Sequence, residues 1–169
     1  GLSQLNKKIL VIDLDPQGNA TTGLGLSNMD NSSDTIYGVL NGSKEIKAVI
    51  KKTEFINLDI ITSNVDLSGL EVETADDRNR AFILKTKLAA YLNTFGQSYD
   101  YILIDCPPSL SLLTVMALVS SNSLLVPLQT EFFALEGLTQ LMKTIDRIKA
   151  GLNPDLKIRG ILLTMYDKR

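Results

Sequence analysis

The chain has 169 residues, of which 44% are hydrophobic, so it is long enough to bury the core of one ordinary domain. It has no histidine, which excludes histidine-based catalysis and histidine metal sites, and its one cysteine, Cys106, excludes an internal disulfide framework. With 17 basic and 19 acidic residues, the net charge of −2 excludes a global basic surface for nucleic acid.

The sequence has no run of about 18 apolar residues and no visible signal peptide, so we expect a cytoplasmic protein that does not enter a membrane. A lone cysteine also fits a reducing compartment. There is no internal repeat or linker, which predicts a single domain over residues 1–169. Because the chain begins with Gly1 and not Met, we expect that it was processed or cut from something longer.

Five apolar runs predict buried β-strands. In chain order they are Ile9–Ile12, Leu58–Thr62, Tyr99–Ile104, Leu124–Leu128 and Ile158–Met165. Their apolar character is nearly continuous and lacks the alternation of a half-exposed strand. This pattern predicts strands that are covered on both faces, as in a parallel sheet.

Helical patterns lie between these strands. A short piece is expected near Ile36–Leu40, and apolar residues recur at helical spacing in Leu84–Phe95 and Leu135–Ile148. The stretch Leu110–Val119 predicts a helix that is buried nearly all round. Strands that alternate with helices predict an α/β fold with a mostly parallel, doubly wound sheet flanked by helices.

The stretch "KKILVIDLDPQGNAT" places two carboxylates at the end of the first strand. Side chains alternate along a strand, so Asp13 and Asp15 share a face if the strand continues that far. Two like charges side by side are unfavourable unless a positive group or a polarised water lies between them. The alternative is a strand end with one solvated Asp and one Asp that forms a turn before Pro16.

Ligands of open parallel sheets bind beyond the carboxyl ends of the strands. The run "YILIDCPPSL" ends there in Asp105, which is the Walker B pattern, whose carboxylate holds Mg²⁺, usually through water. The alternative is an Asp that merely ends a strand. The other polar residues that follow strands are Gln129, Glu131, Tyr166, Asp167 and Arg169.

Four blocks, in order along the chain, resemble the ParA/Soj family of deviant-Walker ATPases, which partition bacterial chromosomes and plasmids. They are "IDLDPQGNATTGLG" (12–25), "YDYILIDCPPSLSLLTVMAL" (99–118), "VPLQTEFFALEGLTQL" (126–141) and "GILLTMYDKR" (160–169). The resemblance implies a P-loop NTPase-like fold that binds ATP and Mg²⁺. It further implies a homodimer in the ATP state, nonspecific DNA binding at the nucleoid, and a ParB-type partner that stimulates hydrolysis.

The resemblance also implies roles for individual residues. Asp15 matches the aspartate needed for hydrolysis, which orients the attacking water, Asp105 the Walker B aspartate, and Asp13 the other acid near the Mg²⁺ shell. The segment 129–137 lies along the nucleotide-dependent dimer face. The residues expected near the adenine are Thr164, Met165, Tyr166 and Asp167.

The chain departs from the family pattern because it contains no KGGxGK[ST] loop, the deviant P-loop that holds the phosphates. The strand before that loop and the basic DNA-contacting part after residue 169 are also absent, so we expect a piece truncated at both ends. By itself it is expected to hydrolyse no ATP and to bind it no better than about millimolar. Without the missing strand, Tyr99–Asp105 would expose unpaired backbone groups unless the sheet closes up or another chain pairs with it.

Two other functions fit part of the pattern. One is a MinD-like deviant-Walker ATPase, which anchors to membrane through a C-terminal amphipathic helix; "DPQ" and "EFFALEGL" favour the ParA side. The other is a non-enzymatic α/β fragment that folds but binds no nucleotide. An iron-protein relative would need cluster-ligating cysteines, and one cysteine is too few.

Overall fold

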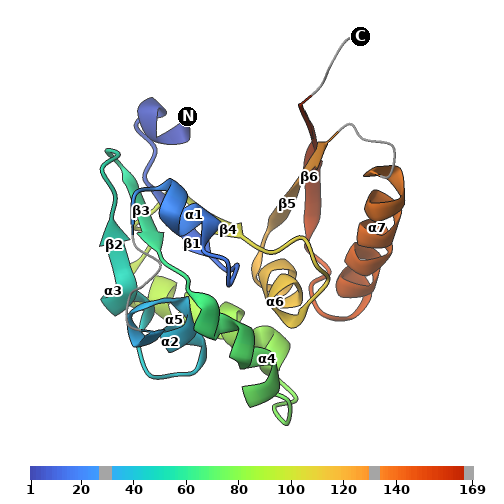
Figure 1. The fold of residues 1–169 in the computed structure, drawn as a ribbon, viewed down its shortest axis with the longest axis horizontal. Coiled ribbons are helices and arrows are strands. Elements are labelled where there is room, and N and C mark those ends of the chain that lie inside the picture. The colour runs from blue at the N-terminus through green and yellow to red at the C-terminus, as the bar shows by residue number, and fades with distance from the viewer. Residues whose placement is uncertain (27–31, 130–133, 166–169) are drawn as a thin grey trace. The chain divides into compact units, whose positions relative to one another are not determined.

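The structure is a computed structural model that describes residues 1–26, 32–129 and 134–165. The chain divides into two compact units, Gly1–Ala117 and Leu118–Arg169, which are described separately below (Figure 1). The prediction of a single domain over residues 1–169 stays a prediction.

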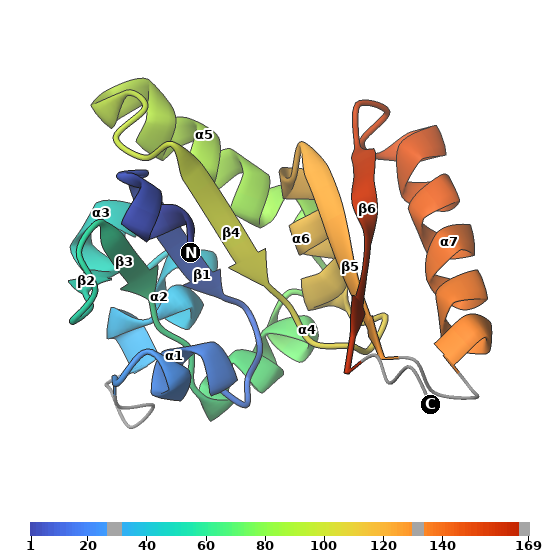
Figure 2. The ribbon, with the colours of Figure 1, turned by 90° about the horizontal axis from the view of Figure 1, so that it is seen from above.

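The first unit is built on a four-stranded sheet in the order β2-β3-β1-β4. Strand β1 (Ile9–Asp13) lies between β3 (Leu58–Ile61) and β4 (Tyr101–Asp105) and is parallel to both, as Figure 2 shows for β1 and β4. Strand β2 (Ile50–Lys52) is antiparallel to β3 at the edge. The predicted mostly parallel sheet flanked by helices is confirmed. Among the described residues, β4 pairs with β1 alone and forms the second edge of this sheet, so its other side keeps the unpaired backbone groups that were expected for Tyr99–Asp105.

The core of this unit lies on one face of the sheet. Leu10 and Ile12 of β1 are fully buried against helices α2 (Ile36–Leu40) and α5 (Ile83–Phe95). Helix α2 begins after Thr35, whose hydroxyl accepts from the N–H of Tyr37, a standard N-cap. Both helices were predicted, α5 from apolar residues at helical spacing and α2 as a short helical piece near Ile36–Leu40.

The sequence patterns did not predict the short elements. The short α-helices are α1 (Asn19–Gly23), α3 (Ile46–Val49) and α4 (Leu70–Glu73), and the 3₁₀ helices are η1 (Leu2–Leu5), η2 (Ser32–Asp34), η3 (Val65–Gly69) and η4 (Arg80–Phe82). Each is at most five residues long, which is too short for a hydrophobic period to be recognised.

Helix α6 (Leu112–Ser120) runs through the division between the units. Leu112, Leu113, Met116 and Ala117 belong to the core of the first unit, and Leu118 and Val119 are also buried. The prediction of a helix buried nearly all round is therefore confirmed.

The second unit contains a two-stranded parallel sheet and one long helix. Strand β5 (Ser123–Gln129) pairs with β6 (Lys157–Thr164), and helix α7 (Ala134–Gly151) connects them. The amide of Asn153, buried in the turn after α7, donates to the carbonyls of Leu118 and Ser121 at 2.8 Å each. This bond pair fixes where the chain turns from α7 toward β6.

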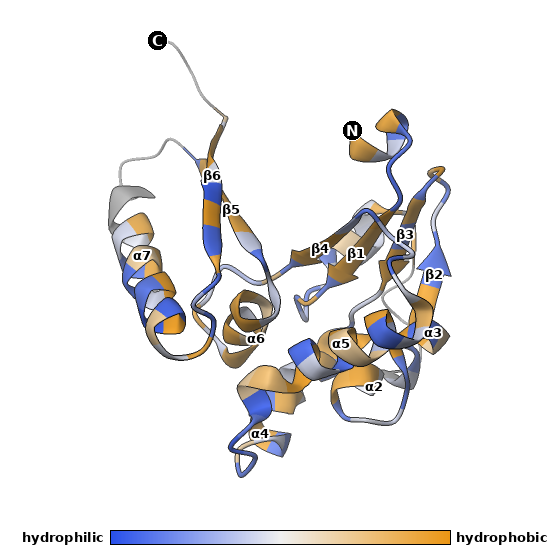
Figure 3. Ribbon diagram, turned by 180° about the vertical axis from the view of Figure 1, so that it is seen from behind, coloured by the Kyte–Doolittle hydropathy of each residue, from blue (hydrophilic) through white to orange (hydrophobic). Residues whose placement is uncertain are grey.

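The expectation that every strand is covered on both faces is wrong for β4, β5 and β6. Figure 3 shows β1, β3 and β4 as strongly hydrophobic, but Tyr101 and Leu103 of β4 are exposed on the face opposite the core. In β6, Ile161, Leu162 and Leu163 are exposed in succession. A continuous apolar run reports the tendency of a strand to be buried, whereas burial itself depends on which layers pack against it.

Among the described residues, no helix combines the length and the apolar character needed to cross a membrane.

Candidate functional site

The structure brings the three predicted acids together at the carboxyl end of the first unit's sheet. Asp13 and Asp105 are the last residues of the adjacent parallel strands β1 and β4 and lie directly opposite each other in register. Paired residues of parallel strands point to the same face. The N–H of Leu14 donates to the carbonyl of Asp105 at 2.7 Å and keeps the chain beside β4 as it leads into Asp15. The predicted placement of the acids is confirmed, while their roles stay predictions.

Asp13 is fully buried, and both of its carboxylate oxygens accept hydrogen bonds. Oδ2 accepts from the backbone N–H and the hydroxyl of Thr21 in α1, each at 2.7 Å. Oδ1 accepts from the N–H of Asp15 at 3.2 Å. A carboxylate is an acceptor-only group, so three donors satisfy it in a place that water does not reach.

Asp15 is half-buried and sits in a tight turn. Its Oδ1 accepts from the N–H of Gln17 at 3.0 Å, and its carbonyl accepts from the N–H of Gly18 at 2.9 Å. Gly18 has a φ of 64°, which glycine adopts without strain. No hydrogen bond reaches Asp15 Oδ2 from the residues that the structure describes. That oxygen is therefore available to accept from a water.

Asp105 differs from Asp13 because its side chain is exposed. Even so, the surrounding protein withdraws enough water from the carboxyl group to raise its pKa above the ordinary value, and the negative charges of Asp13 and Asp15 raise it further. A bound cation would offset the repulsion from these two charges. Asp105 could hold a hydrated Mg²⁺, because its exposed side chain leaves room for the waters that the ion retains.

Cys106 follows Asp105 and packs partly buried against the core. Burial raises the pKa of its thiol to about 11, with further contributions from the charges of Asp105 and Asp15. A thiol of that pKa stays protonated at neutral pH and is a poor nucleophile. Cys106 therefore acts as a small apolar side chain.

Within residues 1–26, 32–129 and 134–165, no three side chains of the acidic, histidine or cysteine type are grouped so that they could hold a metal. The site therefore offers Mg²⁺ few protein ligands. This suits Mg²⁺, which keeps several waters and is often bound through one or two carboxylates together with the phosphates of a nucleotide.

The predicted adenine-site residues lie in the second unit, as far as they are described. Thr164 ends β6 opposite Gln129 of β5, and Met165 follows it with a φ of 52° and an exposed side chain. Gln129 Nε2 contacts Met165 Sδ at 3.4 Å. Four of the residues singled out in the sequence lie outside the described part of the chain: Glu131, Tyr166, Asp167 and Arg169.

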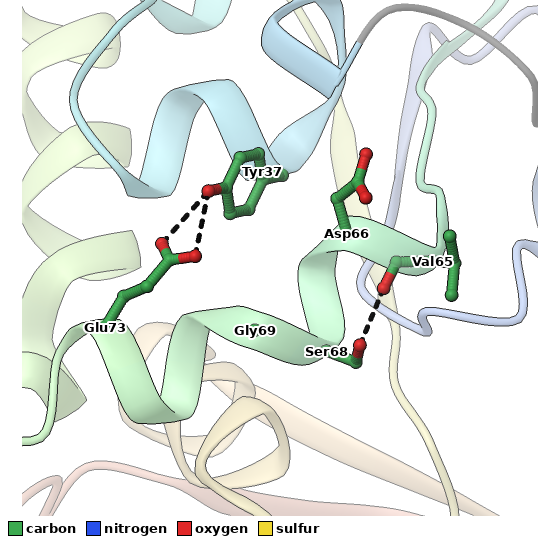
Figure 4. A pocket seen from close by; sticks show the side chains of 6 residues that line it. All are labelled: Tyr37, Val65, Asp66, Ser68, Gly69 and Glu73. Atoms are coloured by element: carbon green, nitrogen blue, oxygen red, sulfur yellow. Dashed lines mark hydrogen bonds between the residues drawn. The ribbon is translucent and has the colours of Figure 1, made fainter.

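A pocket of about 410 Å³ in the first unit does not coincide with the three acids. Figure 4 shows its lining residues, which are Tyr37, Val65, Asp66, Ser68, Gly69 and Glu73. The hydroxyl of Tyr37 lies 3.0 Å from both carboxylate oxygens of Glu73, and Ser68 donates to the carbonyl of Val65 at 2.7 Å. Its polar groups thus bond to their own neighbours, and the strand ends remain the better candidate site.

Sequence reasoning missed Thr21. It is fully buried, and its hydroxyl both donates to Asp13 and accepts from the N–H of Ser63, which follows β3, at 3.0 Å. The only feature of the sequence that points to Thr21 is its position three residues after Gly18, the turn-forming glycine of "DPQGNATT". That spacing predicts the start of a helix but does not say which carboxylate the threonine reaches.

A family model described as "AAA domain" matches residues 1–158. The chromosome partitioning protein ParA of Myxococcus xanthus is 48% identical over 168 residues, which are 99% of this chain and 58% of that protein. The chromosome-partitioning ATPase Soj of Treponema pallidum is 46% identical over 99% of this chain and 63% of its own length. The chain thus spans about three fifths of these relatives.

A solved structure with a similar fold carries a nucleotide. Cobyrinic acid a,c-diamide synthase from Mycobacterium smegmatis, with bound ATP analogue and magnesium, matches with a TM-score of 0.90 and 36% identity. The match covers 99% of this chain and 66% of that one. A protein of similar fold is therefore known with an ATP analogue and magnesium bound.

Proposed function

The chain belongs to the ParA/Soj family of partitioning ATPases, and we propose that it is part of an ATPase that segregates chromosomes or plasmids through ATP-dependent dimerisation and DNA binding. One observation carries this proposal most directly. Asp13 and Asp105 end two adjacent parallel strands, and Asp15 follows in a turn held against them. Acids at the carboxyl edge of a parallel sheet match the needs of phosphoryl transfer, which depends on a held cation and an aligned nucleophile.

In this proposal the acids divide the work. Asp105 holds hydrated Mg²⁺, which neutralises charge on the phosphates when it is bound, and Asp13 lies near its shell. Asp15 is the catalytic residue, because its unoccupied Oδ2 accepts a hydrogen bond from the attacking water and orients it. Alignment of a water needs no covalent chemistry from the protein.

Further contacts are proposed from the resemblance to the family. Thr164 and Met165 are proposed to lie near the adenine, and residue 129 and residues 134–137 are proposed to belong to the homodimer face. The other residues of these two predictions, Tyr166, Asp167 and 130–133, lie outside the described part of the chain. The partners of the whole protein are nonspecific DNA and a ParB-type protein that stimulates hydrolysis. These assignments rest on the family, whose members are named for chromosome partitioning.

The 169 residues by themselves are proposed to be inactive. The sequence has no Gly-Lys pair and no loop of the KGGxGK[ST] type, whose backbone N–H groups and lysines would hold the polyphosphate. The three acids that are present repel a polyphosphate in the absence of those groups. Calorimetry with Mg²⁺ and ATP should give a Kd of about 1 mM or weaker, and micromolar binding would contradict this part of the proposal.

The decisive experiment compares two substitutions in the full-length protein. Asp15→Ala should retain ATP affinity, and raise it if anything, because a negative charge near the phosphates is removed, but should lose single-turnover hydrolysis by a factor of about 100 or more. Asp105→Ala should weaken Mg²⁺-dependent ATP binding as well, because a metal contact is lost in the ground and transition states alike.

Asp76→Ala is the matched control, since this exposed acid lies outside the strand-end group, and it should behave like the unsubstituted protein. If Asp15→Ala loses affinity as severely as Asp105→Ala, both acids are Mg²⁺-shell residues and the water needs another guide. If the unsubstituted full-length protein shows no ATP hydrolysis with DNA and its partner present, the proposed function itself is wrong.

A further inference from the structure

The structure contains a fully buried cluster in which one threonine side chain joins three segments of the first unit. The segments are the end of β1 at Asp13, helix α1 at Thr21, and the loop after β3, in which Ser63 lies two residues beyond the strand. Asp13, Thr21 and Ser63 each have no exposed surface. Buried polar groups of this kind fix a geometry only if they are hydrogen-bonded, and the longest of these bonds joins residues 42 positions apart in the sequence.

The bonds of the cluster run in one direction. The N–H of Ser63 donates to Thr21 Oγ1 at 3.0 Å, and the Thr21 hydroxyl in turn donates to Asp13 Oδ2 at 2.7 Å. The backbone N–H of Thr21 donates to the same oxygen at 2.7 Å. The Thr21 hydroxyl therefore donates one hydrogen bond and accepts another at the same time. Valine has the same shape but can do neither.

Hydrogen bonds to Asp13 hold both ends of the turn that carries Asp15. Asp13 Oδ1 accepts from the N–H of Asp15 at the start of the turn, and Asp13 Oδ2 holds Thr21 just after its end. A single carboxylate thus anchors both ends of residues 15–21. The only freedom left to the Asp15 carboxylate is that of its own side chain, which the Gln17 N–H restrains further.

This arrangement also separates Asp13 from a metal. Three donors occupy its oxygens and it has no exposed surface, whereas Asp105 opposite it is exposed. A hydrated Mg²⁺ retains its waters and needs room beside the carboxylate that holds it. Asp105 offers that room and Asp13 does not.

We propose that Asp13 is a positioning residue, which with Thr21 holds the Asp15 turn in place, and that it does not bind the metal. The consequence for hydrolysis rests on the proposed function, in which Asp15 orients the attacking water. The hydrogen-bonded clamp itself does not depend on that function, so it can be tested by a separate measurement.

The first test compares three threonine variants of the full-length protein. Thr21→Val keeps the shape but removes the hydroxyl, and leaves the buried N–H of Ser63 without an acceptor. Its melting temperature, measured without nucleotide, should fall by on the order of 5 °C. Thr21→Ser keeps the hydroxyl and should recover most of that loss.

The neighbouring residue provides a matched control. Thr22 is exposed, and its hydroxyl bonds only to the carbonyls of Gly18 and Asn19 nearby. Thr22→Val should change the melting temperature by less than about 2 °C. If Thr21→Val is no worse than Thr22→Val, or if Thr21→Ser fails to recover stability, the clamp is refuted.

The second test separates positioning from simple stabilisation. At a temperature where every variant is folded, Thr21→Val should lower kcat for ATP hydrolysis by about tenfold to a hundredfold while KM changes less than about twofold, since a displaced water guide affects the reaction more than binding. Thr21→Ser should restore kcat. A variant that only loses stability would show normal kcat under these conditions, and that result would overturn the positioning role.

The third test concerns the metal. The Mg²⁺ concentration that gives half-maximal ATP binding should rise about tenfold or more for Asp105→Asn and less than about twofold for Asp13→Asn. An equal rise in both would show that Asp13 belongs to the metal site and would refute the inference. Should Asp13→Asn fail to fold, the first two tests still decide the positioning role, because Thr21→Val weakens the clamp while leaving the Asp13 carboxylate present.

The two proposals fail in different ways. If the unsubstituted protein hydrolyses no ATP, the proposed function fails, while the melting temperatures still decide whether the clamp exists. If the protein hydrolyses ATP and the threonine variants behave alike, the function stands and the clamp does not.

Discussion

The two sheets of the molecule begin from similar sequences and reach opposite degrees of burial. Strand β1 reads "ILVID" and β6 reads "KIRGILLT", and both contain three consecutive large aliphatic residues. In β1, Leu10 and Ile12 are completely buried, whereas Leu162 and Leu163 of β6 are each more than half exposed. An apolar run thus indicates that a strand can be buried, but the layers and neighbouring strands that pack against it decide whether it is buried.

The same contrast extends to polar groups. The four-stranded sheet contains the buried Asp13 and Asp59, and the half-buried Tyr99 lies two residues before β4; all three have hydrogen-bond partners. The charged residues of β6, Lys157 and Arg159, are exposed. The described groups with a raised pKa, Tyr99, Asp105 and Cys106, all lie in the first unit. The following predictions test how far the difference between the units holds.

The largest loss of stability is expected from a cavity beneath the four-stranded sheet. Ile12→Ala should lower the free energy of unfolding by about 2–5 kcal/mol, because it leaves a cavity in the core of the first unit. Leu163→Ala should change it by no more than about 0.5 kcal/mol, since the side chain is already largely in water. Urea denaturation of the chain measures both, and similar losses in the two variants would show that β6 is covered in solution.

Substitutions at two glycines test the packing by adding a methyl group instead of removing atoms. A methyl group added at Gly38 of α2 would overlap the backbone carbonyl of Ser33, whereas nothing lies within 4 Å of the corresponding position at Gly160 of β6. Gly38→Ala should therefore cost about 1–3 kcal/mol of unfolding free energy, and Gly160→Ala should stay within about 0.5 kcal/mol of the unsubstituted chain. A neutral Gly38→Ala would mean that α2 and η2 move apart easily.

The hydroxyl of Tyr99 provides a pH-dependent test. It donates to Asp59 Oδ2 at 2.7 Å, and burial together with that bond raises the pKa of Tyr99 above its ordinary value of about 10. Tyr99→Phe should cost about 1 kcal/mol at pH 7, with Tyr101→Phe, in which the ring is exposed, as the matched control.

The sign of the pH effect follows from the raised pKa. The Tyr99 bond contributes stability that is fully present below about pH 10 and is lost as the pH rises toward the folded-state value. The difference between the chain and its Tyr99→Phe variant, measured by denaturation from pH 7 to pH 11, should therefore shrink above pH 10. A constant difference would contradict the raised pKa.

The smallest effect is expected at Asp105. Its pKa is raised because the surrounding protein withdraws water from the carboxyl group and because Asp13 and Asp15 are negatively charged. Its contribution to the stability of the fold is therefore favourable below about pH 4 and is lost as the pH rises and the group ionises. Asp105→Asn should accordingly raise the melting temperature at pH 7 without Mg²⁺, by less than about 3 °C because the group is exposed, and the gain should disappear near pH 3.5. A lowered melting temperature at pH 7 would show that Asp105 is held by a positive partner.

The sequence alone determined the main elements and the place of the site. Apolar runs located β1, β3, β4, β5, β6 and helix α6, and helical spacing located α5 and α7, because each is long or apolar enough to be recognised. The short helix α2 was expected as well. Alternation of these elements predicted parallel strands, and parallel strands bring their carboxyl ends to one edge. That is why the sequence alone groups Asp13, Asp15 and Asp105 at one edge of the sheet.

Only the tertiary structure decided how each of those acids is used. Asp13 and Asp105 look alike in the sequence, since each ends an apolar run, but Asp13 is enclosed by Thr21 and the turn of Asp15 whereas Asp105 faces solvent. Likewise, no pattern distinguished the covered strand β1 from the exposed strand β6. Burial and hydrogen bonding depend on residues that are distant in sequence, such as Ser63 from Thr21, and local periodicity carries no information about those contacts.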